Sequence, residues 1–362
     1  AAGGSGGHIF PATALAAKLA NVEAEVVFVS SKRQLDRSML SSSGYRCYYL
    51  SVNPMPHKLN AGKLIVFLAK FAADTFYSAW IVMKERPNVV VGFGGYSSGA
   101  ISLLSRLFGR KLVIHEQNYF PGRAIVILSR IANLVALSFK GTEKYLPGAG
   151  ARTVLTGNPL RTDILLKDKA GARERMGLAS GKKCLLVMGG SQGASSMNRL
   201  SAEAVIELSG RNADIQVIHL TGKRDHDAIL KFYEDNGITS RVFSFLDRMS
   251  DAYSAADAAV SRSGASAVFE LAYYGLPMVL VPYPNPKNNQ RTNARFFEEK
   301  GAAIYREEKD ISASGLASDI EKVLFDEELR IKMGRSALEA SLPDAAKRLA
   351  DEVIKLVKRK VR

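Results

Sequence analysis

The chain has 362 residues, of which 47% are hydrophobic and 23% charged, so disorder is excluded as its main state. Its formal net charge of +15 indicates an anionic partner such as nucleic acid, a phosphorylated substrate or an anionic membrane. Its two cysteines, Cys47 and Cys184, lie far apart without metal-ligand spacing, which excludes a disulfide scaffold and indicates a reducing compartment.

Short apolar runs without alternation recur along the chain and predict strands that are buried on both faces of a parallel sheet. In chain order these runs are Glu25–Ser30, Asn88–Gly92, Lys111–His115, Leu134–Leu137, Arg152–Thr156, Lys183–Met188, Ile215–Leu220, Val242–Phe245, Ala258–Ser261 and Pro277–Val281. Segments with helical periodicity separate them, so the fold class is predicted to be α/β with parallel sheets.

The motif Gly-Gly-Ser-x-Gly occurs once in each half, at Gly3–Gly7 and at Gly189–Gly193, and each copy leads into a helix. With a length prior of about 150 residues per domain, this predicts two related domains, 1–157 and 158–344. Only two alanines precede the first copy, where a strand is expected, so the numbering is predicted to start inside a longer protein. The tail, 345–362, is predicted to be an amphipathic helix, and its sequence does not say which domain it packs on.

The charge is unevenly distributed. Residues 1–157 hold 18 Lys/Arg against 7 Asp/Glu, and residues 345–362 hold 7 against 2, so residues 158–344 are close to neutral. No signal peptide is recognised, and no transmembrane segment is predicted, because Lys70 and Asp74 interrupt the most apolar stretch, Leu64–Met83.

The stretch 63–84 has two interpretations. Its apolar side chains fill a core, or part of them is exposed in a bilayer interface and lysines at 58, 63, 70 and 84 are attracted to anionic lipid. The apolar residues concerned are Leu64, Ile65, Phe67, Leu68, Phe71, Phe76, Trp80 and Ile81.

Three glycine-rich loops carry the chemistry: Gly3–Gly7, Gly92–Tyr96 and Gly189–Gly193. Glycine lets the backbone approach a ligand, and the first and third loops open helices whose free N–H groups attract phosphate. The alternative is that they are tight turns. None matches G-x-G-x-x-G or Walker A, so NAD binding and ATP hydrolysis are disfavoured.

The segment Ser261–Pro277 predicts a strand end followed by a short helix that Gly275 and Pro277 close. Glu270 falls one to two turns into this helix, where a carboxylate could accept hydrogen bonds from both ribose hydroxyls. Alternatively it is a solvated helix residue. The amides of Asn289 and Gln290 suit sugar hydroxyls, or they belong to a polar loop and helix cap.

Together these motifs resemble the MurG family, the UDP-N-acetylglucosamine transferases of bacterial cell-wall synthesis, over nearly the whole chain. The segments that carry the resemblance are Gly3–Pro11, Gly92–Gly99, His115–Asn118, Gly157–Pro159, Gly189–Gly193 and Arg262–Gly275. The resemblance implies a GT-B fold, in which two Rossmann-like parallel-sheet domains face a cleft and the C-terminal helix packs back on the first domain.

The resemblance also implies a reaction. GlcNAc would pass from UDP-GlcNAc to lipid I, undecaprenyl-pyrophosphoryl-MurNAc-pentapeptide, with inversion, to give β-1,4-linked lipid II. The enzyme would be peripheral, on the cytoplasmic face of the bacterial plasma membrane, with an anionic membrane surface as a further partner.

Site residues follow from the resemblance by position. In the second domain Ser191 would hold the donor phosphate, as would Arg161, the Leu246 backbone would read uracil and Glu270 the ribose, and GlcNAc would meet Ala265, Asn289 and Gln290. In the first domain the acceptor would be surrounded by His8, Tyr96, Glu116 and Asn118, beside Ser5 and Gly6 of the first loop.

His8 is the preferred general base, because it stands beside a phosphate-type loop and titrates near neutrality. Glu116 is the rival base, and the alternative for His8 is a capping or orienting role. A helix N-terminus and Arg161 would stabilise the leaving UDP, so no metal or other cofactor is expected to be obligatory.

Two other functions compete. A different GT-B enzyme, such as a diacylglycerol glycosyltransferase or a UDP-GlcNAc 2-epimerase, would share the architecture. A nucleic-acid-binding protein would spread basic residues and exposed aromatic residues across the surface. Here the excess charge avoids 158–344 and the glycine loops would have no purpose, so nucleic acid is not an expected partner.

Overall fold

A computed structural model describes residues 1–4, 6–41, 43–51, 61–146, 152–164, 167–189, 194–211, 214–285 and 289–358. The chain divides into two compact units. The first consists of Ala1–Arg161 together with Asp344–Arg362, and the second is Thr162–Pro343. The first division therefore falls four residues beyond the boundary expected at Gly157.

The second unit is built on a six-stranded parallel sheet in the order β12-β11-β10-β7-β8-β9. Its strands are β7 (Lys183–Met188), β8 (Ile215–Leu220), β9 (Ser240–Phe243), β10 (Ala258–Ser261), β11 (Met278–Leu280) and β12 (Ala303–Tyr305). Counted from β7, this is the strand order of the doubly wound nucleotide-binding fold, in which ligands bind at the carboxyl ends of the strands where the order reverses. That switch point lies between β7 and β10.

Helices cover the sheet of the second unit. They are α6 (Lys169–Arg175), α7 (Ser195–Ser209), α8 (His226–Asp235), α9 (Met249–Ala255), α10 (Ala265–Tyr273), α11 (Gln290–Glu299), α12 (Ala313–Phe325) and α13 (Glu327–Ser341), with 3₁₀ helices at Thr162–Ile164 and Glu308–Asp310. Side-chain caps start several of them: Asp168, Ser312 and Asp326 each accept a hydrogen bond from a backbone N–H of the first turn. The core combines inward faces of α7 and α12 with β7, β8 and β10.

The first unit holds two parallel sheets, β1-β2 and β3-β4-β5-β6. Their strands are β1 (Val27–Ser31), β2 (Arg46–Leu50), β3 (Val89–Gly92), β4 (Lys111–Glu116), β5 (Leu134–Leu137) and β6 (Arg152–Leu155). The backbone N–H of Ala2 donates to Val29 (3.0 Å), and Ala1 accepts from Phe93 (2.9 Å). Residues 1 and 2 therefore lie between the two sheets, and the order again reverses there, beside β3.

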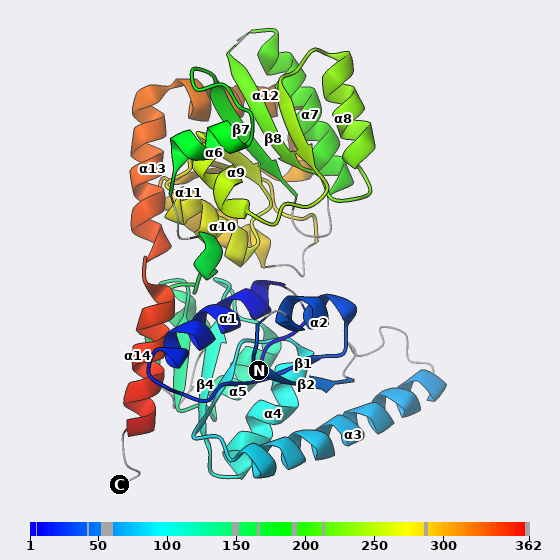
Figure 1. Ribbon diagram of the computed structural model, residues 1–362, viewed down its shortest axis with the longest axis vertical. Helices are drawn as coiled ribbons and strands as arrows, with labels where there is room; N and C mark the ends of the chain where they lie inside the picture. The colour runs from blue at the N-terminus through cyan, green and yellow to red at the C-terminus, as the bar shows by residue number, and fades with distance from the viewer. Residues whose placement is uncertain are drawn as a thin grey trace. The chain divides into compact units, whose positions relative to one another are not determined.

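The helices of the first unit include one from the end of the chain. They are α1 (Gly6–Ala20), α2 (Gln34–Ser41), α3 (Ala61–Glu85), α4 (Tyr96–Leu107), α5 (Arg123–Ser129) and α14 (Ala345–Lys358), with a 3₁₀ helix at Thr142–Tyr145. Figure 1 shows α14 alongside α1. Leu349, Ala350 and Val353 of α14 are buried in the same core as Ile9 and Phe28, and Lys111 donates to the last carbonyls of α14.

Helix α3 is an exception to the burial of the other helices. It contains the stretch Ile65–Glu85, which is long and apolar enough to cross a membrane by length and composition, contrary to our expectation that no segment qualifies. Asp74, Ser78, Ile81 and Val82 form its buried stripe, at helical spacing, and α3 packs against α4. Only 22% of the apolar window is buried.

Candidate functional site

The switch point of the second unit gathers the loops that the sequence singled out. Met188 ends β7 and leads into Gly189, while Ser261 ends β10 and leads into Gly264, which precedes α10. A Cβ on Gly189 would lie 2.8 Å from that of Ala194, so glycine lets the backbone after β7 lie this close to the start of α7. Ser191 lies outside the described residues.

Glu270 is buried, which rules out the solvated-helix interpretation. Its Oε2 accepts a hydrogen bond of 2.5 Å from the hydroxyl of Tyr253, a residue that is itself buried on α9. The Tyr253 ring packs at 5.3 Å from that of Tyr274. Because one carboxylate oxygen is held by a packed tyrosine, the orientation of Glu270 within α10 is fixed.

The amide cluster lies against the loop that precedes α10. The Ser263 hydroxyl donates to the Gln290 carbonyl (2.8 Å), and the Asn293 side chain donates to the Ser263 carbonyl (3.1 Å). The side-chain carbonyl of Gln290 accepts from the backbone of Tyr283 (2.9 Å), and Asn289 immediately precedes α11. These bonds bring residues 289–293 next to the first turn of α10.

Two of the remaining donor-side residues lie in the second unit and one lies in the first. Ala265 is the buried first residue of α10, and Leu246 lies in the loop between β9 and α9. Arg161 belongs to the first unit, where its guanidinium lies 4.7 Å from the centre of the Phe10 ring.

The first unit repeats the arrangement with its own two glycine loops. A Cβ on Gly95 would lie 2.2 Å from the Gly3 carbonyl oxygen, so the two loops meet backbone to backbone. Gly6 is the first residue of α1, and Tyr96 opens α4, so the second glycine loop also precedes a helix, which we did not expect. Ser5 lies outside the described residues.

His8 stands in the first turn of α1, against Gly94. Its Nδ1 is 3.1 Å from the side-chain oxygen of Gln117. Burial lowers the pKa of His8 below the usual imidazole value, while Gln117, the Phe93 carbonyl and the charge of Asp36 act in the opposite direction. A helix N-terminus also disfavours a cation, so His8 is held as a neutral imidazole.

Glu116 has a different environment from the one expected of a catalytic base. It is buried, its Oε1 accepts from the backbone and side chain of Asn118 (2.8 and 3.1 Å), and its Oε2 accepts from the Gly122 backbone (3.0 Å). Burial raises the pKa of Glu116. Both oxygens are therefore used to shape the loop after β4, and Asn118 is one of their partners.

Three residues of this unit were missed by the sequence analysis. His115 and Gln117 flank Glu116 and link to His8, and Asp36 accepts from the Gly4 backbone (2.8 Å) and from the Ser31 hydroxyl (2.5 Å). The only sequence signal for the first two is their place in the motif His115–Asn118. Asp36 gives no local signal, because its role depends on a loop 32 residues away.

The chain also contains one Asp-x-Asp triplet, Asp225-His226-Asp227, so our expectation that no metal is obligatory was wrong in taking such a triplet to be absent. Asp225 accepts from Ser195 and Asn198 (both 2.9 Å), whereas Asp227 is fully exposed beside His226. Among the residues that the structure describes, no group of three or more His, Cys, Asp or Glu could hold a metal ion.

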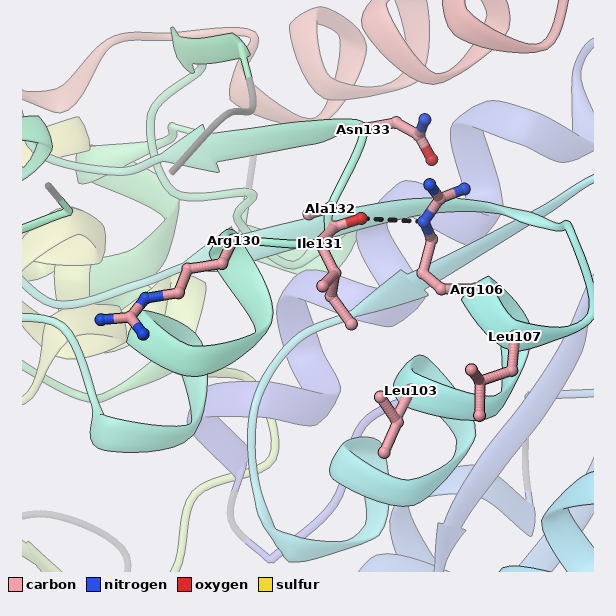
Figure 2. A pocket seen from close by; sticks show the side chains of 7 residues that line it. All are labelled: Leu103, Arg106, Leu107, Arg130, Ile131, Ala132 and Asn133. Atoms are coloured by element: carbon pink, nitrogen blue, oxygen red, sulfur yellow. Dashed lines mark hydrogen bonds between the residues drawn. The ribbon is translucent and has the colours of Figure 1, made fainter. Parts of the chain in front are cut away.

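The first unit also has a pocket of about 520 Å³, and Figure 2 shows the side chains that line it. It is lined by Leu103, Arg106, Leu107, Arg130, Ile131, Ala132 and Asn133. Arg106 donates to the Ile131 carbonyl (2.8 Å), and the side chains of Leu103 and Leu107 are exposed. None of the predicted site residues lines this pocket.

Comparisons with known proteins agree with this fold. Residues 1–137 match the glycosyltransferase family 28 N-terminal domain, and residues 184–349 match its C-terminal domain. A crystal structure of MurG from Acinetobacter baumannii superposes with a TM-score of 0.78 at 27% identity and covers 98% of each chain. A putative UDP-N-acetylglucosamine 2-epimerase from Listeria monocytogenes has a TM-score of 0.71 at 14% identity over 98% of this chain and 94% of its own, and it shares the fold alone.

Two parallel-sheet units with glycine loops at both switch points form the GT-B fold that the resemblance implied, and the two family 28 domains make the chain a glycosyltransferase. Among its relatives is the UDP-N-acetylglucosamine--N-acetylmuramyl-(pentapeptide) pyrophosphoryl-undecaprenol N-acetylglucosamine transferase of Anaeromyxobacter sp. (strain K), which is 35% identical over 99% of this chain and 93% of its own. The chain belongs to this family of transferases, the MurG family.

Proposed function

We propose that this chain transfers GlcNAc from UDP-GlcNAc to lipid I, with inversion at the anomeric carbon, and so forms the β-1,4 bond of lipid II. The observation that carries the proposal is the match to relatives named for this transfer, such as that of Anaeromyxobacter sp., over nearly the full length of both chains. The fold alone would also suit the 2-epimerase, so that match decides between them.

The donor belongs at the switch point of the second unit. The helices α7 and α10 start without a side-chain cap, so the backbone N–H groups of their first turns would suit a diphosphate, and the oriented carboxylate of Glu270 would suit the ribose hydroxyls. The backbone at Leu246 would read uracil, and GlcNAc would meet Ala265 and the amides of Asn289 and Gln290. Ser191 and Arg161 complete the proposed set around the phosphates.

The acceptor belongs at the switch point of the first unit, near Ser5, Gly6 and Asn118. His8 is the better base, because its imidazole is neutral and partly accessible beside two glycine loops. Glu116 is less suited, since both its oxygens already accept hydrogen bonds from its own loop. Tyr96 opens α4 beside the same loops and remains a proposed contact.

Incubating the chain with radiolabelled UDP-GlcNAc and a lipid I analogue should give labelled lipid II. We expect the rate to persist after chelation, because helix N-termini and Arg161 would neutralise the leaving diphosphate without an obligatory metal. Loss of activity in EDTA with recovery only on Mg²⁺ or Mn²⁺ would contradict that second expectation. Isomerisation of the donor without acceptor would instead identify an epimerase.

We also propose that α3 lies in the interface of the membrane that carries the acceptor, on its cytoplasmic face. Ile65, Leu68, Phe71, Phe76 and Trp80 are exposed on α3, so core packing does not account for them. The exposed Leu103 and Leu107 of α4, beside Arg106 and Arg130, extend this apolar and basic character on the first unit (Figure 2). Lys58 and the side chains at 63 and 64 lie outside the described residues.

An interfacial helix is favoured over a spanning one by the buried stripe of α3. Asp74 is buried and accepts from the Ser51 backbone (2.9 Å), and Lys84 lies 4.5 Å from the centre of the Trp80 ring. A helix with one face packed on protein and an aromatic, lysine-bearing opposite face suits the headgroup region.

The double variant Phe76→Glu/Trp80→Glu should reduce binding to vesicles of anionic phospholipid by about tenfold or more, because two aromatic side chains that would enter the interface are lost and two carboxylates that anionic lipid repels are added. Flotation at moderate salt measures this. Ile331→Glu, at an exposed apolar position of α13 in the second unit, is the matched control and should float like the wild type. Equal flotation of the wild type and the α3 variant would exclude the proposed interface.

A further inference from the structure

A chain of hydrogen bonds connects His8 to the carbonyl of Gly157, which follows β6. His8 Nδ1 lies 3.1 Å from Gln117 Oε1, Gln117 Nε2 lies 3.0 Å from His115 Nδ1, and His115 Nε2 lies 3.2 Å from the Gly157 carbonyl oxygen. His115 and Gln117 are buried. Residues from α1, from the end of β4 and from the turn after β6 therefore form one chain of hydrogen bonds inside the first unit.

Two backbone carbonyls, those of Gly157 and His115, determine which atom donates and which accepts in every hydrogen bond of this chain. A carbonyl only accepts, so His115 Nε2 carries the hydrogen that faces Gly157, and His115 Nδ1 is then an acceptor. Gln117 Nε2 is 3.2 Å from the His115 carbonyl as well as 3.0 Å from His115 Nδ1, so this end of the amide is the donor. Gln117 Oε1 is therefore left to accept from His8 Nδ1.

We propose that Gln117 and His115 are positioning residues that hold His8 in the Nδ1–H tautomer, so that Nε2 is the atom that takes the proton in the transfer. This rests on the proposed function. Nε2 removes the hydrogen of the attacking sugar hydroxyl, and that oxygen forms the bond to the anomeric carbon of GlcNAc. The bond from this carbon to the UDP oxygen breaks, its electron pair leaves with UDP, and the proton stays on His8.

His115 and Gln117 stay uncharged while His8 gains and then loses a proton. Burial lowers the pKa of His115 to about 4, so His115 keeps its single hydrogen and its direction near neutral pH. The groups that act on the charge of His8 are Asp36, the Phe93 carbonyl and Gln117, and all of them favour the imidazolium that forms after proton transfer. A neutral amide orients the ring without supplying a carboxylate that would hold His8 protonated at rest.

Nuclear magnetic resonance of protein with ¹⁵N-labelled histidine tests the tautomer directly. In the wild type we expect His8 Nδ1 to have the shift of a protonated nitrogen and Nε2 that of an unprotonated one, with the signals assigned by their loss in His8→Asn.

Gln117→Leu should abolish this preference for the Nδ1–H tautomer and lower kcat by about 10- to 100-fold, with the KM for UDP-GlcNAc unchanged. Gln117→Glu should keep Nδ1–H, raise the pKa of His8 and move the acidic limb of the pH–rate profile to higher pH.

Gln216→Leu is the matched control. Gln216 is also a buried glutamine that bridges backbone groups, at Ala179, but it lies in the second unit, so its loss should leave the His8 signals and kcat unchanged. A wild-type His8 that carries its hydrogen on Nε2, or a Gln117→Leu variant with unaltered spectrum and kcat, would overturn the proposal. If the wild type shows Nδ1–H but does not label lipid I, the proposed function fails and the tautomer assignment stands.

Discussion

His8→Ala should lower kcat for GlcNAc transfer by about 10²- to 10⁴-fold, the usual contribution of a positioned general base, with little change in the KM for UDP-GlcNAc. The reason is that His8 belongs to the first unit, whereas the proposed donor contacts are concentrated in the second. Steady-state transfer to a lipid I analogue, with the donor varied, measures both parameters. His226→Ala, at a histidine of the second unit outside the proposed site, should behave like the wild type.

The pH–rate profile gives the same assignment a second test. His8 accepts a proton only when it is neutral, so activity falls as the pH drops through its pKa. Because burial lowers that pKa, the acidic limb of kcat/KM should lie below the value of about 6.5 expected for an ordinary histidine. An unchanged kcat in His8→Ala, or an unchanged acidic limb of the pH–rate profile in that variant, would show that another residue is the general base.

The positions of the two glycine-loop sites could be predicted from sequence because their signals are local. A buried strand that runs directly into glycines and then a helix requires a tight turn at the carboxyl end of a parallel sheet. Gly95 and Gly189 both lie in such turns, and a Cβ on either would lie less than 3 Å from a neighbouring atom. At these positions the tight turn requires glycine, so the glycine in the sequence directly marks the turn.

Short strands were predicted less well. β2 and β12 were missed, and β9 begins two residues before the predicted run, at Ser240. All three are short, and β9 and β12 lie at the edges of their sheet, where a strand needs fewer apolar residues. The predicted run extended to Phe245, which is exposed in the loop beyond β9.

The roles of individual polar residues depended on contacts that sequence does not contain. Glu116 stood out as an acid in a motif, but its carboxylate is used by Asn118 and Gly122, and the neighbouring Gln117 reaches His8 across 109 residues of chain. The sequence does not show whether Glu116 or Gln117 faces His8, because adjacent side chains at the end of a strand point to opposite faces of the sheet. Their side-chain directions follow only from the register of β4.

The other large effect is expected for the donor. Glu270→Gln should raise the KM for UDP-GlcNAc by roughly 10- to 150-fold, since hydrogen bonds to a charged group contribute about 1.5–3 kcal/mol, while kcat changes little. Glutamine keeps an oxygen to accept from Tyr253, so the variant avoids leaving a buried hydroxyl without an acceptor. Calorimetric titration with UDP should show the same loss of affinity, because the ribose is common to both ligands.

Two further variants separate recognition of the ribose from stability. Tyr253→Phe removes the hydroxyl that donates to Glu270 and leaves the carboxylate itself, so its KM should rise less than that of Glu270→Gln. Glu203→Ala removes a carboxylate from α7 that pairs with Arg199 at the surface, and it should leave both KM and UDP affinity unchanged. Wild-type affinity for UDP in Glu270→Gln, with the fold intact by melting temperature, would remove Glu270 from the donor site and with it the assignment of the switch point between β7 and β10.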